Sequence, residues 1–322
     1  MKAVPTALLA LAALALLAAP PARGQNLSGK KVMFLNSYHE GYEWSDEIEK
    51  GVRMVLGPTG ARLEFYRMDT KRNQSEEFRK QAGEKARAAI EAFRPDLVIA
   101  ADDNAVKYVL VQYYKNAKLP FVFCGVNWDA SRYGLPFSNA TGMEEVALVK
   151  ELLENLRVYA KGKRVGFLTV DSETERIEGP WYTKRLGLSF TRESYVKTLA
   201  DWKAEFARMQ NEVDVLLLGN YSGINDWDEK EAAAFALANT RVPSGGMYDF
   251  MMPYSMLGLV KVAEEQGIWS AKTAVKILQG TPPSKIAVLQ NKQGKTMINL
   301  KLAQKGGVVF RPELTRNAQV MK

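Results

Sequence analysis

The chain has 322 residues, of which 47% are hydrophobic and 25% charged, and its formal net charge at pH 7 is +8. These values are typical of a globular protein with one large domain or two ordinary lobes, and they exclude a disordered or low-complexity chain. The basic residues are spread among acidic ones without a basic and aromatic stripe, so no nucleic-acid partner is expected. Cys124 is the single cysteine, and its apolar neighbours predict a buried, inert thiol.

The first 24 residues have the pattern of a secretory signal peptide. Lys2 precedes an unbroken Ala/Leu run over residues 7–19, which is too short to span a bilayer. Small residues follow near the expected cleavage site, which we place after Gly24. No cysteine lies close to that site, so a lipoprotein anchor is not expected. The sequence therefore predicts a secreted chain that begins at Gln25.

The first half of the chain alternates strand and helix patterns. Apolar or alternating runs predict strands over residues 31–35, 62–68, 97–100 and 121–123. Helices are expected from Ser45, over residues 75–93, and from the end of the third strand to about Ala117. A capping-box pattern over residues 141–144 predicts a further helix to about Tyr159. Short connections between these elements predict a parallel α/β sheet with right-handed crossovers.

The same rhythm restarts in the second half. Strands are expected over residues 164–170, 188–196, 213–218 and 242–247, with helices over 201–210 and up to Leu237. This repetition predicts two similar lobes instead of one very wide sheet. The tail contains an apolar run at 254–263, a helix at 270–278, a strand at 286–289 and a final helix after 298–301, which could complete both lobes. We expect residues 30–140 plus 250–281 to form lobe 1, and 141–249 plus 282–322 to form lobe 2.

Aromatic and polar residues follow nearly every predicted strand, at the end where open parallel sheets bind ligands. Asp102 and Asp103 come directly after a short apolar strand, although either residue could instead cap the next helix. Aromatic faces supply contact area and polar neighbours fix orientation, while any single Trp is also explained by packing. If the strand ends of both lobes face one cleft, they form a small-molecule site that closes by a hinge. The candidate ligand-binding residues are Ser37, Tyr38, Tyr42, Trp44, Asp102, Asp103, Asn127 and Trp128 for one wall, and Asp171, Trp181, Asn220, Tyr221, Tyr248 and Asp249 for the other.

Patterns typical of catalysis are weak in this sequence. His39 is the only histidine, and no Gly-x-Ser-x-Gly nucleophile motif occurs. Clustered Cys and His for zinc are missing, and so are the glycine-rich loops that hold phosphates. The acidic run at 226–229 lacks the spacing of a calcium loop and is explained by helix capping. We therefore expect no catalytic residue, no metal site and no cofactor, and binding without turnover.

Three segments resemble one protein family. They are residues 36–45 (Asn-Ser-Tyr-His-Glu-Gly-Tyr-Glu-Trp-Ser), the strand at 95–100, and the ending at 274–283 followed by 298–303. Together they resemble the ABC-transporter substrate-binding family with the type I periplasmic-binding-protein fold, from about Lys31 to the carboxyl end. The resemblance implies two Rossmann-like lobes with parallel sheets, joined by three crossings, and a ligand held between them. Members of this family include binders of aromatic amino acids, and relatives often sit beside sensor kinases.

The sequence departs from the amino-acid-binding members at one strand end. Those relatives commonly place small and hydroxyl residues after the Pro-Asp-Leu-Val strand, where they can take the ligand carboxylate. Here the chain has Asp102, Asp103 and Asn104. Like charges at short range repel by about 4 kcal/mol at an effective dielectric constant near 20. An anionic ligand group is therefore not expected there unless these side chains turn away, and a cationic or polyhydroxylated ligand stays open.

The residues and the resemblance together predict a periplasmic solute-binding protein. We expect it to capture a small polar or aromatic ligand (an amino acid, an amine or a polyhydroxyl compound) and to deliver it to an ABC permease. One alternative is a periplasmic subunit that presents the ligand to a membrane sensor kinase. A third hypothesis is a ligand-free structural or adhesion module. From another class, a secreted hydrolase would use a carboxylate pair drawn from Asp102, Asp103, Asp171 and Asp249.

Overall fold

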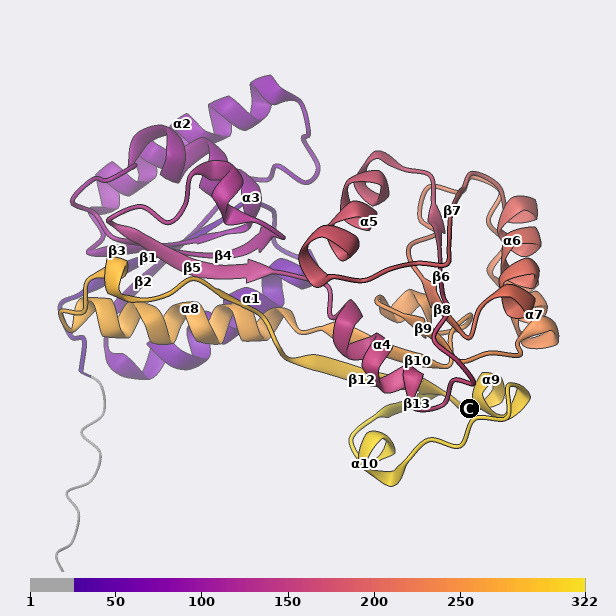
Figure 1. Cartoon of the computed structure of the whole chain (residues 1–322). Coiled ribbons are helices and arrows are strands. Elements are labelled where there is room, and N and C mark those ends of the chain that lie inside the picture. The colour runs from indigo at the N-terminus through magenta and orange to yellow at the C-terminus, as the bar shows by residue number, and fades with distance from the viewer. Residues whose placement is uncertain (1–25, 322) are drawn as a thin grey trace, which may run out of the picture.

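The computed structural model describes residues 26–321, and the signal peptide predicted at 1–24 lies outside the described residues. The chain forms two separate β-sheets, each with helices on both faces, and a long helix, α8, runs along the first of them (Figure 1). Within residues 26–321, no helix is both long and apolar enough to cross a membrane.

The first sheet has six strands, all parallel, in the spatial order β11-β5-β4-β3-β1-β2. Helices α1 and α8 pack together against one face, and α2 covers the other (Figure 1). The strands are β1 (Lys31–Asn36), β2 (Arg62–Arg67), β3 (Leu97–Ala101), β4 (Phe121–Asn127), β5 (Ala140–Glu145) and β11 (Leu289–Gln290); the α-helices are α1 (Glu43–Leu56), α2 (Glu76–Phe93), α3 (Asp102–Ala105) and α8 (Ala263–Leu278).

The second sheet has seven strands in the order β13-β12-β10-β9-β8-β6-β7, and only the β10–β12 pair is antiparallel. Helix α4 lies on one face, and α6 and α7 lie along the opposite side of this lobe (Figure 1). The strands are β6 (Val165–Val170), β7 (Arg192–Val196), β8 (Val215–Leu218), β9 (Ser244–Gly246), β10 (Leu257–Lys261), β12 (Gly294–Asn299) and β13 (Gln319–Met321); the α-helices are α4 (Val149–Arg157), α5 (Glu173–Leu186), α6 (Leu199–Glu212), α7 (Glu229–Asn239), α9 (Leu300–Lys305) and α10 (Pro312–Thr315).

The sequence explains most of these elements locally. Strands β3, β6 and β8 are short apolar runs, and every residue in them is buried, as expected for parallel strands covered on both faces. Ser75 accepts a hydrogen bond from the Phe78 N–H and so caps α2, while Thr198 and Asp228 cap α6 and α7 in the same way. The predicted α/β class with mainly parallel sheets is confirmed.

The helix predicted from the capping-box pattern at residues 141–144 is wrong at its start. These residues belong to β5, whose backbone pairs with β4, and the helix begins only at Val149. All six residues of β5 are buried between β4 and β11. Backbone pairing inside the sheet therefore outweighs the local capping signal, which is a common way for tertiary structure to override propensity.

The chain passes from one sheet to the other at three places: after β5, after β10 and after β11. The three-crossing arrangement predicted from the resemblance is confirmed. The sequence placed the lobe limits at 140/141, 249/250 and 281/282. In the structure the chain crosses later, after one more strand in each case. Strands β5 and β11 lie in the first sheet and β10 lies in the second, so each of these strands was expected in the opposite lobe.

Candidate functional site

A cavity of about 680 Å³ is lined by residues from both lobes and from the crossing strands. Its walls are built largely from the carboxyl ends of strands, where parallel α/β sheets place their ligand sites. From the first lobe come Tyr38, Tyr42, Glu43, Trp44, Glu47, Lys71, Asp102 and Asn127, from the second come Met247, Tyr248, Asp249, Phe250 and Lys295, and at the crossings lie Glu145, Val260, Lys261, Val262 and Ala263.

Seven of the fourteen candidate residues line this cavity: Tyr38, Tyr42, Trp44, Asp102, Asn127, Tyr248 and Asp249. Each follows or ends a strand, or begins the helix after it. Residues predicted from their place at strand ends, in distant parts of the chain, therefore lie around one cavity. Their roles in binding stay predictions.

Ser37 and Asp103 lie just behind the cavity wall. The Ser37 hydroxyl donates to the Ala101 carbonyl (2.6 Å) and accepts from the Ala105 N–H (2.7 Å), so it ties the end of β1 to α3. Asp103 turns toward Arg132, with which it forms an ion pair, and accepts from the Asn127 side chain at 2.8 Å. Both residues support the wall without lining it.

Asp171, Trp181 and Asn220 lie away from the cavity. Asp171 pairs with Arg176 at 2.7 Å near the start of α5. Trp181 packs against the core of the second lobe, with the Arg185 guanidinium 5.2 Å from its ring. The Asn220 side chain accepts from the Ser222 N–H at 2.7 Å and stabilises a local turn. None of the three lines the shared cavity.

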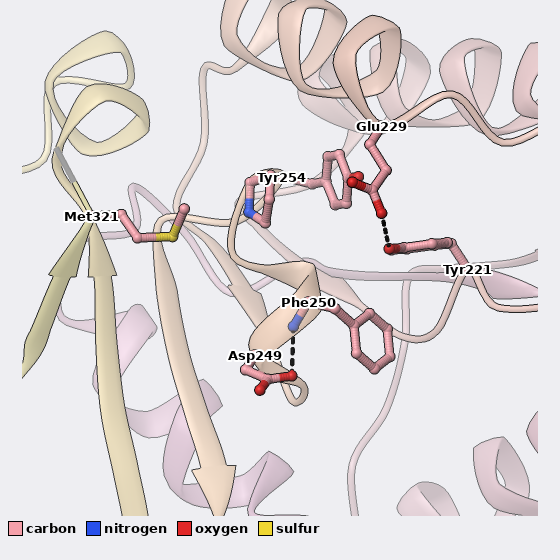
Figure 2. Close-up of a pocket in the computed structure, with 7 residues that line it drawn as sticks. Tyr221, Glu229, Asp249, Phe250, Tyr254 and Met321 are labelled. Carbon is pink, nitrogen blue, oxygen red and sulfur yellow. Dashed lines mark hydrogen bonds between the residues drawn. The ribbon is translucent and has the colours of Figure 1, made fainter.

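Tyr221 lines a second, smaller cavity of about 340 Å³ on the second lobe (Figure 2). Its ring stacks on Trp227 at 4.4 Å between centroids, and its hydroxyl donates to Glu229 at 3.1 Å. The other lining residues are Asp249, Phe250, Pro253, Tyr254 and Met321. Asp249 and Phe250 line both cavities, so this short segment is the partition between them.

Trp128 has a position that the sequence did not suggest. It follows β4 of the first lobe, yet its buried ring belongs to the hydrophobic core of the second lobe. The ring meets Tyr182 edge-on with 5.4 Å between centroids. Arg185 of α5 donates to the Trp128 carbonyl (2.9 Å) and pairs with Asp129 (2.7 Å). Trp128 therefore joins the lobes and does not line the cavity.

Asp102 is the most unusual group in the cavity wall. It is 1% exposed, and its backbone has a φ of +69°, a region that non-glycine residues rarely adopt. One carboxylate oxygen, Oδ1, accepts from the Trp44 indole N–H at 3.1 Å. The other, Oδ2, has no hydrogen-bond partner among the described residues. Burial raises the pKa of Asp102, and the nearby carboxylates of Glu145 and Asp103 raise it further.

Glu145 and Lys261 form an ion pair beside Asp102, and the sequence analysis missed both residues. Burial raises the pKa of Glu145, although the Lys261 ammonium partly opposes that shift. Burial lowers the pKa of Lys261, but the Glu145 carboxylate outweighs it and the net shift is upward. Lys261 is a charge at the end of an apolar strand, which is the signal that could have found it. Glu145 was missed because the sequence predicted a helix where it ends strand β5.

The arrangement offers ligand-binding groups and little that is typical of catalysis. Of the four carboxylates considered for hydrolysis, only Asp102 and Asp249 line the cavity, one in each lobe. Asp103 and Asp171 are held by arginines outside it. Among the described residues, no group of three or more His, Cys, Asp or Glu side chains is placed to hold a metal ion.

Comparison with known families matches residues 46–322 to the ABC transporter substrate binding protein family. The chain belongs to this family. The match begins after the 36–45 segment that contributed to the resemblance, so that segment lies outside it. The family is one of substrate-binding proteins, generally non-enzymatic and typically periplasmic or extracellular. No curated protein sequence matches this substrate-binding chain.

Solved structures confirm the type I periplasmic-binding-protein fold. A ligand-free, open substrate binding protein with adhesive properties from Clostridium difficile has a TM-score of 0.69 at 16% identity, covering 91% of this chain and 99% of that chain. An ABC domain from Streptococcus pneumonia in complex with L-Trp has a TM-score of 0.54 at 19% identity, covering 91% and 100%. A periplasmic ribose ABC transporter protein from Conexibacter woesei has a TM-score of 0.56 at 12% identity, covering 89% and 97%. At these identities the likeness concerns the fold alone.

Proposed function

We propose that this substrate-binding protein captures a small polar or aromatic ligand between its lobes and delivers it to an ABC permease. The observation that carries the proposal is the 680 Å³ cavity, because its lining comes from both lobes and from the strands that connect them. A ligand in this position contacts both lobes at once. It therefore favours the closed arrangement over any arrangement in which the lobes stand apart.

The lining supports an amino acid, an amine or a polyhydroxyl compound as the ligand. Aromatic side chains from both lobes offer faces for an apolar body, among them Tyr42, Trp44 and Tyr248. Five carboxylates and three lysine ammonium groups offer polar contacts. The L-Trp held by the pneumococcal protein and the ribose named for the Conexibacter protein are the first compounds to test.

Membership of the family supports a membrane permease as the partner. The mature chain would reach it from the periplasm after cleavage near Gly24. A sensor kinase remains the alternative receiver of the liganded protein. Crosslinking the liganded chain to membranes of its own cell, followed by identification of the bound membrane protein, separates the two.

Mass spectrometry of the compounds that co-purify with the mature protein tests the binding function. We expect a small molecule that rebinds in calorimetric titration. Because Asn127 and Tyr248 line opposite walls, Asn127→Ala and Tyr248→Ala should each weaken its binding by about 1–3 kcal/mol, the scale of a lost buried contact. Asp171→Ala is the matched control, since Asp171 was predicted for the site but lies outside the cavity. Equal binding by all three variants would remove the cavity as the site.

A further inference from the structure

Asp102 is a buried carboxylate that the chain itself does not neutralise. Its only side-chain hydrogen bond comes from Trp44, and Oδ2 has no partner among the described residues. Within residues 26–321, no Lys, Arg or His nitrogen lies within 4.0 Å of this carboxylate. An ionised carboxylate removed from water is costly unless a cation or several donors face it. Since Asp102 lines the cavity, a bound ligand is placed to supply them.

The nearest lysines are engaged elsewhere. Lys261 forms its ion pair with Glu145. The Lys71 ammonium lies over two rings of the first lobe, 5.2 Å from the Tyr38 centroid and 4.9 Å from the Tyr42 centroid. The carboxylates of Glu145 and Asp103 act on Asp102 with the same sign as its own charge. The Lys71 ammonium acts on the pKa of Asp102 in the opposite direction, but its effect is smaller than that of either carboxylate. The field at this corner of the cavity therefore favours a positive group over a neutral or negative one.

The position of the Asp102 carboxylate is tightly fixed. Its backbone takes the unfavourable positive φ at the first residue after β3. The Trp44 indole holds Oδ1, and Gly125 packs against the same oxygen so closely that a Cβ there would lie 2.8 Å from it. A strained backbone that persists at a ligand cavity is a sign of preorganisation. The side chain is thus held in place before any ligand arrives.

We propose that Asp102 binds the ammonium group of an aromatic amine, whose apolar body lies against Trp44 and Tyr248. This inference rests on the proposed function, because it names the ligand class of the same cavity. The ammonium pairs with the ionised Asp102 carboxylate at the cavity wall, while the rings supply apolar and cation–π contact. A ligand carboxylate is not required at Asp102; of the three cavity lysines, only Lys261 forms an ion pair with a described residue.

Four indole compounds that differ in charge test which charge on the ligand the cavity prefers. They are tryptamine, which carries only the ammonium, indole-3-ethanol, which is neutral, indole-3-propionate, which is anionic, and L-tryptophan, which is zwitterionic. D-Ribose adds a polyhydroxyl probe. Calorimetric titration of the mature wild-type chain should give tryptamine a Kd roughly 10- to 150-fold lower than that of indole-3-ethanol, the range of one hydrogen-bonded charge. Indole-3-propionate should bind most weakly.

Asp102→Asn keeps the shape of the side chain and removes its charge. This variant should lose the preference for tryptamine over indole-3-ethanol while its thermal midpoint does not fall, because a buried charge has been removed. The wild-type panel decides the question even if the variant fails to fold. Stronger binding of L-tryptophan, indole-3-ethanol, indole-3-propionate or D-ribose than of tryptamine would overturn the inference and leave the proposed function intact. Failure of every probe would overturn the aromatic-amine class, and failure to co-purify or rebind any compound would overturn the proposed function itself.

Discussion

Gly125 and Asp102 depend on each other at the end of two neighbouring strands. Gly125 has a φ of +67°, and the space that a Cβ would need is taken by the Asp102 carboxylate. Any side chain at residue 125 therefore strains the backbone and also displaces the proposed cation-binding group. Gly134 has a φ of +75°, but a Cβ there would meet only the Phe137 ring at 3.6 Å. The two glycines share a backbone conformation and differ in what they touch.

Gly125→Ala should lower both stability and tryptamine binding. The positive φ costs about 1–2 kcal/mol for an alanine, and the displaced carboxylate weakens binding in addition. Gly134→Ala is the matched control, because it carries the backbone cost alone. Chemical denaturation should show a loss for both variants that is larger for Gly125→Ala, and calorimetry should show weaker binding only for Gly125→Ala. Equal binding by the two would mean that Asp102 tolerates the displacement.

Glu175 should make stability depend on pH. It is 1% exposed, it accepts a hydrogen bond from the Thr169 hydroxyl at 2.6 Å, and burial raises its pKa to about 7. Nearby Glu178 adds to the upward shift. The folded state therefore holds this proton more tightly than the unfolded state, whose carboxyl has a pKa near 4.5. The stabilisation is complete below about pH 4.5 and is lost as the pH rises through about 7.

Glu175→Gln should remove this pH dependence. At pH 8 the variant should be more stable than the wild type by up to about 3 kcal/mol, the free energy of the pKa shift. Denaturation midpoints measured from pH 4 to pH 8 provide the test. The exposed Glu151→Gln should keep the wild-type profile. The wild type should lose stability relative to Glu175→Gln as the pH rises from 5 to 8. If the stabilities of the two proteins change in parallel over this range, the assignment is wrong.

Individual site residues were predictable where the information was local. Asp102 follows a short apolar strand, so the sequence placed it at a strand end, and it lines the cavity. Asp103 is its neighbour and shares the same pattern, but it turns toward Arg132, about thirty positions later in the chain. The sequence shows both aspartates, but it does not show that Arg132 contacts only one of them. Lys261 was missed because only aromatic, hydroxyl, amide and carboxylate residues at strand ends were taken as candidates, although this charge ends an apolar strand.

At the scale of elements, Trp128 connects β4 to α5 of the other lobe. Its ring lies among Val146, Tyr182 and the second-lobe core, while Arg185 holds its carbonyl and the neighbouring Asp129. The sequence identified Trp128 as a strand-end aromatic, which is also the pattern of a ligand contact. Only the packing of α5 against the end of β4 decides that this ring joins the lobes.

Trp128→Ala should therefore destabilise the fold. Removing a buried Trp ring costs about 3–5 kcal/mol, part of which comes from the cavity left behind. Trp181→Ala is the control, because Trp181 lies on α5 but is only half-buried. Calorimetric unfolding should show a large decrease in midpoint for Trp128→Ala and a smaller one for Trp181→Ala. A wild-type midpoint for Trp128→Ala would contradict its role between the lobes.

Elements were predictable where period and capping agreed. The strands β3, β6 and β8 and the helices α2 and α6 have clear apolar runs or capping residues. Strand β5 was not, because its Thr-Gly-Met-Glu segment imitates a capping box. Its strand conformation comes from β4 and β11 on either side. The error moved one lobe limit and hid Glu145, so a local mistake changed both the lobe division and the site.

At the scale of the whole molecule, Glu145 and Lys261 tie two of the crossings together. Glu145 ends β5 of the first sheet, and Lys261 ends β10 of the second. Both strands lead directly into a crossing, and the ion pair between their last residues spans the two sheets. The Glu145 side chain is only 7% exposed. Breaking a buried pair leaves an uncompensated charge. Replacing one partner therefore lowers the stability more than replacing both.

Glu145→Gln and Lys261→Met should each lower stability by about 3 kcal/mol, the low end for a broken buried pair because Lys261 is partly exposed. The double variant should recover most of that loss, since it leaves no unpaired charge. Lys30→Met breaks the exposed Lys30–Asp96 pair, leaves the Asp96 contact with the Lys31 N–H in place, and should cost less than about 1 kcal/mol. If the pair also couples the lobes, calorimetry of either single variant should split the unfolding transition into two, as expected when two lobes no longer unfold together. Additive losses in the double variant would show that the two side chains act independently at the crossings.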